Sequence, residues 1–116
     1  MEIEVGEYVR TDKGIIAKVD EIRLGTNRKK KIFQNVYELD NGRWTVIDYI
    51  IKHSKNIIDL IEVGDYLDIL ADGSPLRFEV DKIDFKHKLK NIANEIKIRS
   101  IVTKEQMASI EYRVKE

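Results

Sequence analysis

Two stretches of this chain begin alike: EVGEYVRT starts at Glu4, and EVGDYLDIL starts at Glu62. A second matched pair follows in the same order, VDEI at 19–22 and VDKI at 80–83. The copies are separated by 58 residues in the first pair and by 61 residues in the second. Two matched blocks in one order favour an internal duplication. The sequence therefore predicts two related halves, 1–61 and 62–116.

Most of the chain predicts short strands, because its apolar runs are four to eight residues long and rich in Val, Ile and Tyr. Gly- and Asp-containing turns separate these runs. Segment 52–61 predicts a turn and then a strand from Asn56 to Ile61, and the alternative is a helical turn that begins at Ser54. The other predicted strands are 3–10, 15–22, 32–40, 43–51, 63–70, 76–83, 95–102 and 112–114.

A hairpin is predicted where Asn41-Gly42 lies between two apolar runs, because a type I′ turn needs positive φ at both of its central residues. A two-residue turn pairs Leu39 with Trp44, and it leaves Glu38 and Thr45 on the polar face. One apolar face results, made of Tyr37, Leu39, Trp44 and Val46. We therefore expect Trp44 in the core. The alternative is an aromatic groove for a peptide, made of Trp44, Tyr8 and Tyr66.

A short C-terminal helix is predicted by TKEQ at 103–106. The Thr103 hydroxyl can cap the first turn, and Gln106 can reach back to the Thr103 amide, as in a capping box. The helix is expected to run through Ser109.

The order of predicted elements in each half is strand, loop, strand, loop, hairpin, helical turn and strand, which resembles an SH3-like barrel. The predicted fold is therefore mostly β. It consists of two tandem SH3-like small barrels packed together, with one short C-terminal helix. The alternative is one continuous antiparallel sheet covered by a helix.

Composition excludes several kinds of chemistry. The 116 residues contain no cysteine, so the chain has no disulfide, thiolate zinc site or cysteine nucleophile. His53 and His87 are the only histidines, too few for a structural zinc site. No G-x-S-x-G elbow and no glycine-rich phosphate loop occurs. We therefore expect a protein that is not an enzyme and that holds no metal or cofactor.

The chain has no apolar run near the ~20 residues that span a bilayer. Glu2, Glu4 and Glu7 interrupt the N-terminal segment, so it does not resemble a signal peptide. A cytoplasmic protein that does not bind membranes is expected.

Local charge clusters suggest binding surfaces, although the 21 basic and 21 acidic residues balance and argue against a protein that coats nucleic acid. Basic segments 23–31 and 82–99 could hold phosphates or a partner, and the alternative is a pair of solvated loops. Their candidate contact residues are Arg28, Lys29, Lys30, Lys31, Lys86, Lys88 and Lys90. An acidic run is either a partner patch or a solvated strip, and its candidates are Asp59, Glu62, Asp65 and Asp68.

Three stretches resemble a group of small proteins encoded by phages and prophages of Firmicutes. They are VGEYVRTDKGIIAKV at 5–19, KHSKNIIDLIEVGDYL at 52–67 and IRSIVTKEQMASIEYRV at 98–114. The resemblance implies a phage origin and a setting in the host cytoplasm. It implies no chemistry, but it favours accessory roles such as inhibiting host defence or redirecting a host enzyme.

The predicted function is that of a non-enzymatic phage accessory protein that binds a host or phage protein and in this way could inhibit a host defence system. The first alternative is a nucleic-acid-binding module that uses the basic segments 23–31 and 82–99. The second alternative is a component of the phage particle.

Overall fold

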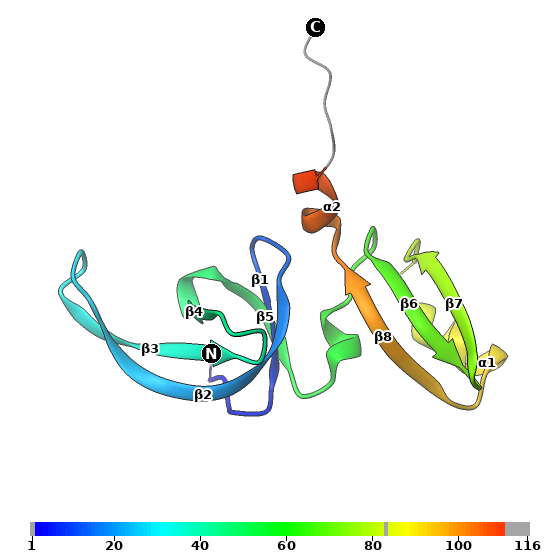
Figure 1. The fold of residues 1–116 in the computed structure, drawn as a ribbon, viewed down its shortest axis with the longest axis horizontal. Coiled ribbons are helices and arrows are strands. Elements are labelled where there is room, and N and C mark those ends of the chain that lie inside the picture. Colours follow the sequence, from blue (N-terminus) through cyan, green and yellow to red (C-terminus); the bar gives the residue numbers. More distant parts are fainter. Residues whose placement is uncertain (1, 83, 111–116) are drawn as a thin grey trace, which may run out of the picture. The chain divides into compact units, whose positions relative to one another are not determined.

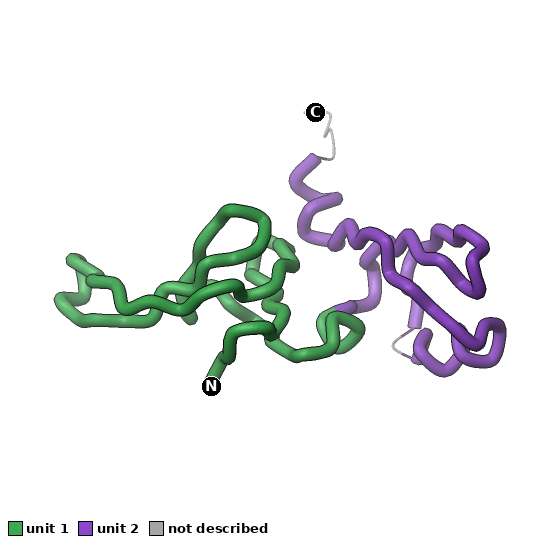
Figure 2. The backbone as a smooth tube through the Cα atoms, turned by 60° about the horizontal axis from the view of Figure 1, so that its bottom comes forward, with its two compact units in different colours: residues 1–60 green, residues 61–116 purple. Residues whose placement is uncertain are grey.

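The computed structural model describes residues 2–82 and 84–110 as a mostly β chain with two antiparallel sheets (Figure 1). The chain divides into two compact units, Met1–Leu60 and Ile61–Glu116 (Figure 2). The sequence repeat predicts a boundary between residues 61 and 62.

Unit 1 holds a five-stranded antiparallel sheet in the order β4-β3-β2-β1-β5. One 3-10 turn, η1, precedes the last strand, and a second, η2, follows it. The predicted strand at 56–61 is wrong, because these residues form η2, where the Asn56 side chain accepts a hydrogen bond from the Ile58 amide (3.2 Å). The elements are β1 (Tyr8–Thr11), β2 (Ile16–Asn27), β3 (Ile32–Leu39), β4 (Trp44–Val46), η1 (Ile47–Tyr49), β5 (Ile50–Ser54) and η2 (Ile57–Leu60).

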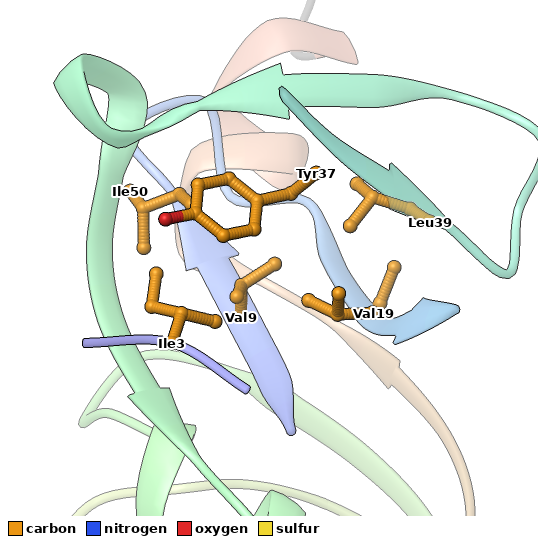
Figure 3. Close-up of a cluster of buried hydrophobic side chains, with 7 residues drawn as sticks. Ile3, Val9, Val19, Tyr37, Leu39 and Ile50 are labelled. Carbon is orange, nitrogen blue, oxygen red and sulfur yellow. The ribbon is translucent and has the colours of Figure 1, made fainter. Parts of the chain in front are cut away.

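The core of unit 1 lies against its central strand, β1. Val9 on β1 and Val19 on β2 are at most 1% exposed, and each such burial contributes about 1.5–3 kcal/mol. Figure 3 shows how side chains from the N-terminal segment and all strands but β4 meet around these valines. The cluster consists of Ile3, Val9, Ala17, Val19, Tyr37, Leu39 and Ile50.

Unit 2 holds a three-stranded antiparallel sheet in the order β7-β6-β8 and two helices. Its elements are β6 (Tyr66–Ala71), β7 (Ser74–Glu79), α1 (Phe85–Ile92), β8 (Ile96–Val102) and α2 (Lys104–Ile110). The five-stranded order predicted for each half is not found in residues 61–82 and 84–110, where Phe85–Ile92 form α1, which buries Phe85 and Leu89 one turn apart. Neither sheet closes on itself. The predicted strand 112–114 lies outside the described residues.

The repeated sequence blocks form one hydrogen-bonded turn in both units. In unit 1 the Gly6 amide donates to the Val19 carbonyl (2.9 Å), and the Val19 amide donates to the Glu7 carbonyl (2.8 Å). In unit 2 the same two bonds join Gly64 to Val80 (2.8 Å) and Val80 to Asp65 (2.8 Å). In each unit, the second matched sequence block is therefore hydrogen-bonded to the first. We call residues 4–7 with Val19, and 62–65 with Val80, the repeat turns.

A buried carboxylate completes each repeat turn. Glu7 Oε2 accepts from the Glu4 amide (2.6 Å), and Asp65 Oδ2 accepts from the Glu62 amide (2.8 Å). Glu7 is 8% exposed and Asp65 is fully buried. The preceding glycine has a φ of 93° in unit 1 and 97° in unit 2, a conformation that a side chain disfavours. The glycine and the acid of the repeat are thus both explained by the turn.

The likeness of the two units extends to their strands. The ladder of β1 with β5 shifts register between residues 10 and 11, and that of β6 with β8 shifts between 68 and 69, again 58 residues apart. Beyond the first strand, Asp12 donates its amide to the Tyr49 carbonyl and Asp72 donates its amide to the Glu95 carbonyl, both at 2.8 Å. The order β7-β6-β8 therefore corresponds to β2-β1-β5. Unit 2 has α1 where unit 1 has β3, β4 and η1.

The hairpin around Asn41-Gly42 exists, but its predicted register is wrong by one residue. Leu39 donates its amide to the Arg43 carbonyl (2.8 Å), so the loop has three residues, of which Gly42 alone has a positive φ. Trp44 then lies opposite Glu38, and the neighbouring residue Thr45 is buried. A slip of one residue turns every side chain of a strand to the other face. A two-residue hairpin loop in which both residues have a positive φ does occur in unit 2, at Asp72-Gly73 between β6 and β7.

The predicted capping box is confirmed. The Thr103 amide donates to Gln106 Oε1 (3.0 Å), and the Gln106 amide donates to Thr103 Oγ1 (3.3 Å). The Lys104 amide, at the start of α2, donates to Asp65 Oδ1 (3.0 Å). The carboxylate of Asp65 thus joins the repeat turn of unit 2 to its C-terminal helix.

Replacing Asp65 with alanine is expected to destabilise the protein by about 2–4 kcal/mol, because it removes charged acceptors from two backbone amides in a buried place. Urea unfolding followed by circular dichroism measures the change. Asp81→Ala is the matched control, since Asp81 is exposed in the same unit, and its effect should stay within about 0.5 kcal/mol. Equal effects of the two substitutions would contradict the role given to Asp65.

Glu7 gives unit 1 a predicted dependence on pH. Burial acts to raise the pKa of Glu7, but the hydrogen bonds from the Glu4 amide and the His53 ring (2.9 Å) together leave the pKa below its ordinary value. A lowered pKa stabilises the fold above the unfolded-state value of about 4.3. This stability is lost as the pH falls through the folded-state pKa.

The variant Glu7→Gln should therefore be less stable than the parent at pH 7 and should lose less stability on acidification. Thermal unfolding at a series of pH values from 7 to 3 measures both effects. If the two proteins show the same difference in melting temperature at every pH, the account of Glu7 is wrong.

Candidate partner-binding groove

The outward-facing side chain of Trp44 marks a candidate binding surface in unit 1. Trp44 is 64% exposed, although it is the only tryptophan of the chain, and Tyr49 at the end of η1 is 54% exposed. Both side chains line the same two hollows of the surface. Large exposed aromatic side chains beside a hollow are typical of binding sites.

The larger hollow has a volume of about 460 Å³ and lies between β4 and the tip of the β2–β3 hairpin. Gly25, Val36 and Val46 supply its apolar part, one from each of the three adjacent strands. Val36 and Val46 are a direct cross-strand pair, and both are buried. We call this site the Gly25 hollow.

A side chain at position 25 would collide with Val36, so the close packing at this position favours glycine. A Cβ atom built on Gly25 would lie 2.6 Å from Val36 Cγ2, well inside contact distance. The φ of Gly25 is not among the positive values of the chain, so backbone freedom is not the reason. The missing side chain lets Val36 pack closely beside β2 and keeps the hollow open.

The smaller hollow has a volume of about 270 Å³. The β1–β2 turn contributes Asp12, Lys13 and Ile15, and the β3–β4 hairpin contributes Leu39 and Arg43. We call it the Lys13 hollow. Trp44 and Tyr49 line it as well. We call the two hollows, together with the two aromatic residues that they share, the unit 1 groove.

The charged side chains that line the unit 1 groove are mostly basic. Asp12 is the single carboxylate, and Arg23 is paired with Glu38 (2.8 Å) on the neighbouring strand. The basic residues are Lys13, Arg23, Arg28, Lys29 and Arg43. The groove therefore favours a negatively charged ligand.

The hairpin tip beside the groove is shaped by local hydrogen bonds. Asn27 Oδ1 accepts from the amides of Lys29 and Lys30, both at 3.1 Å. The Lys30 ammonium donates to Asp48 Oδ2 on η1 (2.7 Å), and this hydrogen bond raises the pKa of Lys30. The contact links the tip to the turn that carries Tyr49.

The predicted basic candidates fall into two places. Arg28, Lys29, Lys30 and Lys31 are exposed together at the β2–β3 tip, where Arg28 and Lys29 line the Gly25 hollow. The other three lie in unit 2 on α1, which is a helix and not a loop, with Lys86 half-buried and Lys88 and Lys90 exposed.

The predicted acidic candidates are held by contacts within the protein. Asp59 accepts from Ser54 Oγ (2.7 Å), and Glu62 pairs with Lys104 (2.8 Å). The Asp68 side chain, 15% exposed, lies near Arg77 (3.4 Å) and Arg99 (4.0 Å). Asp65 is fully buried, so it cannot belong to an exposed partner patch.

Sequence reasoning missed Tyr49 and Gly25, and it placed Trp44 in the core. Tyr8 and Tyr66, the other proposed groove residues, do not line either hollow. An isolated glycine inside a strand pattern often marks a close backbone approach. Gly25 lies beyond the predicted strand 15–22, in a segment expected to be a loop, so this signal became readable only when β2 was seen to run to Asn27. Nothing local distinguishes the register that exposes Trp44.

Comparisons with known proteins add no family: no protein family model, curated protein or solved structure matches this chain. Among the described residues, no helix is long and apolar enough to cross a membrane. The same residues contain no cluster of three or more His, Cys, Asp or Glu side chains that could hold a metal ion.

The contact of Gly25 with Val36 can be tested by a double-mutant cycle. Gly25→Ala should destabilise the protein by about 1–3 kcal/mol, because the new methyl group overpacks against Val36. Combining it with Val36→Ala removes the clash, so the two costs should not add and should differ from their sum by about 0.5–3 kcal/mol. Additive costs, measured by urea unfolding, would show that the two residues do not interact.

Proposed function

We propose that this chain is a non-enzymatic binding protein that holds a protein partner in the unit 1 groove. The observation that carries the proposal is the exposure of Trp44 and Tyr49 where the two hollows meet. Aromatic and arginine side chains at the centre of a hollow supply most of the binding energy in many interfaces. An apolar hollow with a few polar groups at its rim is the usual form of a binding site.

The topology of unit 1 supports this use of the groove. The strand order β4-β3-β2-β1-β5, with a single 3-10 turn before the last strand, is the arrangement expected of an SH3-like module. Such modules bind extended segments of other proteins along an aromatic groove. We restrict the SH3-like proposal to unit 1, because the part of unit 2 that the structure describes holds a sheet of three strands.

The sequence resemblance to phage and prophage proteins suggests the setting in which the groove acts. The partner would be a host or phage protein in the host cytoplasm, and binding would act by occupying its surface. Inhibition of a host defence protein is one outcome that such occupation would produce. Attachment to another protein of the phage particle is another.

The basic hairpin tip favours a second candidate function, binding of single-stranded nucleic acid. Trp44 and Tyr49 could stack on bases, while Arg28 and Lys29 contact phosphates. We prefer a protein partner for two reasons. Aliphatic side chains such as Val36 are part of the lining of the hollows, and the chain as a whole has no excess of basic residues.

Affinity capture from an infected host lysate tests the proposal. The tagged protein should retain one stoichiometric protein partner after nuclease treatment, and Trp44→Ala and Tyr49→Ala should each abolish or strongly weaken this capture. Tyr66→Ala is the matched control, because Tyr66 is also an exposed aromatic residue, 41% exposed, but lies in unit 2.

Capture that survives both groove substitutions would place the partner elsewhere and refute the proposal. Capture that disappears with nuclease would favour nucleic acid. In that case, affinity should also fall steeply as the salt concentration rises.

A further inference from the structure

We infer that the ligand of the unit 1 groove is an extended acidic protein segment that places an apolar side chain in each hollow and a carboxylate near Arg28 and Lys29. This inference rests on the proposed function and specifies its ligand. It follows from the charge, the apolar lining and the arrangement of the two hollows.

Charge decides the class of segment. The Gly25 hollow is lined by Arg23, Arg28 and Lys29 and by no carboxylate, and the Lys13 hollow is lined by two basic side chains and Asp12. Glu38 neutralises Arg23 at 2.8 Å, which leaves the basic excess at Arg28 and Lys29. A lysine- or arginine-rich segment would be repelled there, whereas glutamate or aspartate would be attracted.

The apolar lining decides what accompanies the acidic residues. Val36 and Val46 in one hollow, and Ile15 and Leu39 in the other, offer aliphatic contact on both sides of Trp44. Volumes of about 460 and 270 Å³ admit side chains of a short peptide. A segment with acidic residues alone would leave the apolar parts of both hollows without a contact.

The position of the two aromatic rings decides the shape of the ligand. Because Trp44 and Tyr49 line both hollows, a ligand that fills both must pass over these rings. An extended strand places alternate side chains about 6–7 Å apart on one face, which suits a ligand that must place one side chain in each hollow. The ligand therefore does not need to be helical to place side chains in both hollows.

Selection from a random library of 12-residue peptides tests the inference. The intact protein is the first bait, and Trp44→Ala is the second. A third bait carries Arg28→Glu with Lys29→Glu, and a fourth carries Lys88→Glu with Lys90→Glu. The fourth bait makes the same change in net charge on α1 of unit 2, so it controls for charge alone.

Peptides enriched on the intact protein should be acidic, with two bulky apolar residues separated by a short spacing. Their affinity should fall about tenfold or more on the Arg28→Glu, Lys29→Glu protein, the scale of about 1.4 kcal/mol for one lost charged contact. Lysine in place of the peptide acids should restore binding to this variant. The variant with both α1 lysines replaced should bind like the parent.

The outcomes distinguish a failure of the acidic-ligand inference from a failure of the proposed protein-binding function. Neutral or basic peptides that need Trp44 would overturn the acidic ligand and leave the groove as a protein-binding site. No enrichment over the Trp44→Ala bait would overturn both. A 12-nucleotide oligothymidylate that binds with the same dependence on Trp44, when acidic peptides do not, would overturn the inference in favour of nucleic acid.

Discussion

The fold depends on a turn closed by a buried carboxylate, which occurs once in each half of the chain. The glycine of each repeat turn has a positive φ. The carboxylate of the residue that follows accepts a hydrogen bond from the backbone amide three residues before it. The valine of the second block then exchanges two backbone hydrogen bonds with the turn. These bonds fix the first strand of each unit against the second. They account for the glycine and the acidic residue that EVGEY and EVGDY share.

The two units differ in what lies between this shared framework and the last strand. Unit 1 inserts the β3–β4 hairpin and η1, which supply Val36, Trp44 and Tyr49 to the groove. Unit 2 inserts α1 at the corresponding place, and its equivalent of β2 remains an edge strand that contains Pro75. Proline at a sheet edge removes a backbone donor and discourages pairing with another chain. Val36, Trp44 and Tyr49 of the unit 1 groove therefore come from elements that only unit 1 adds to the framework.

Local signals predicted local features well. The capping box at Thr103 and the strands predicted at 15–22 and 32–40 follow from short-range chemistry, and the structure has the capping box and, at these strands, β2 and β3. The strand predicted at 43–51 is instead divided into β4, η1 and β5. The β3–β4 register failed because it depends on a distant contact: Asp40 exchanges hydrogen bonds with Lys18 on β2, at 2.9 and 3.0 Å. Asp40 makes this contact from within the loop, which has three residues, and Trp44 faces outward. The groove could not be predicted for the same reason, since its central side chain lies on the face that the expected register buries.

Residue-by-residue amide hydrogen exchange of the intact chain tests most directly the claim that both halves share one framework. The account predicts that the amides of Gly6 and Val19 in unit 1, and of Gly64 and Val80 in unit 2, are among the most protected in their own units. Protection should disappear at Gly64 and Val80 first in Asp65→Ala. Fast exchange at Gly64 and Val80 in the parent protein, alongside slow exchange at Gly6 and Val19, would show that the second half does not hold the turn and would contradict the account.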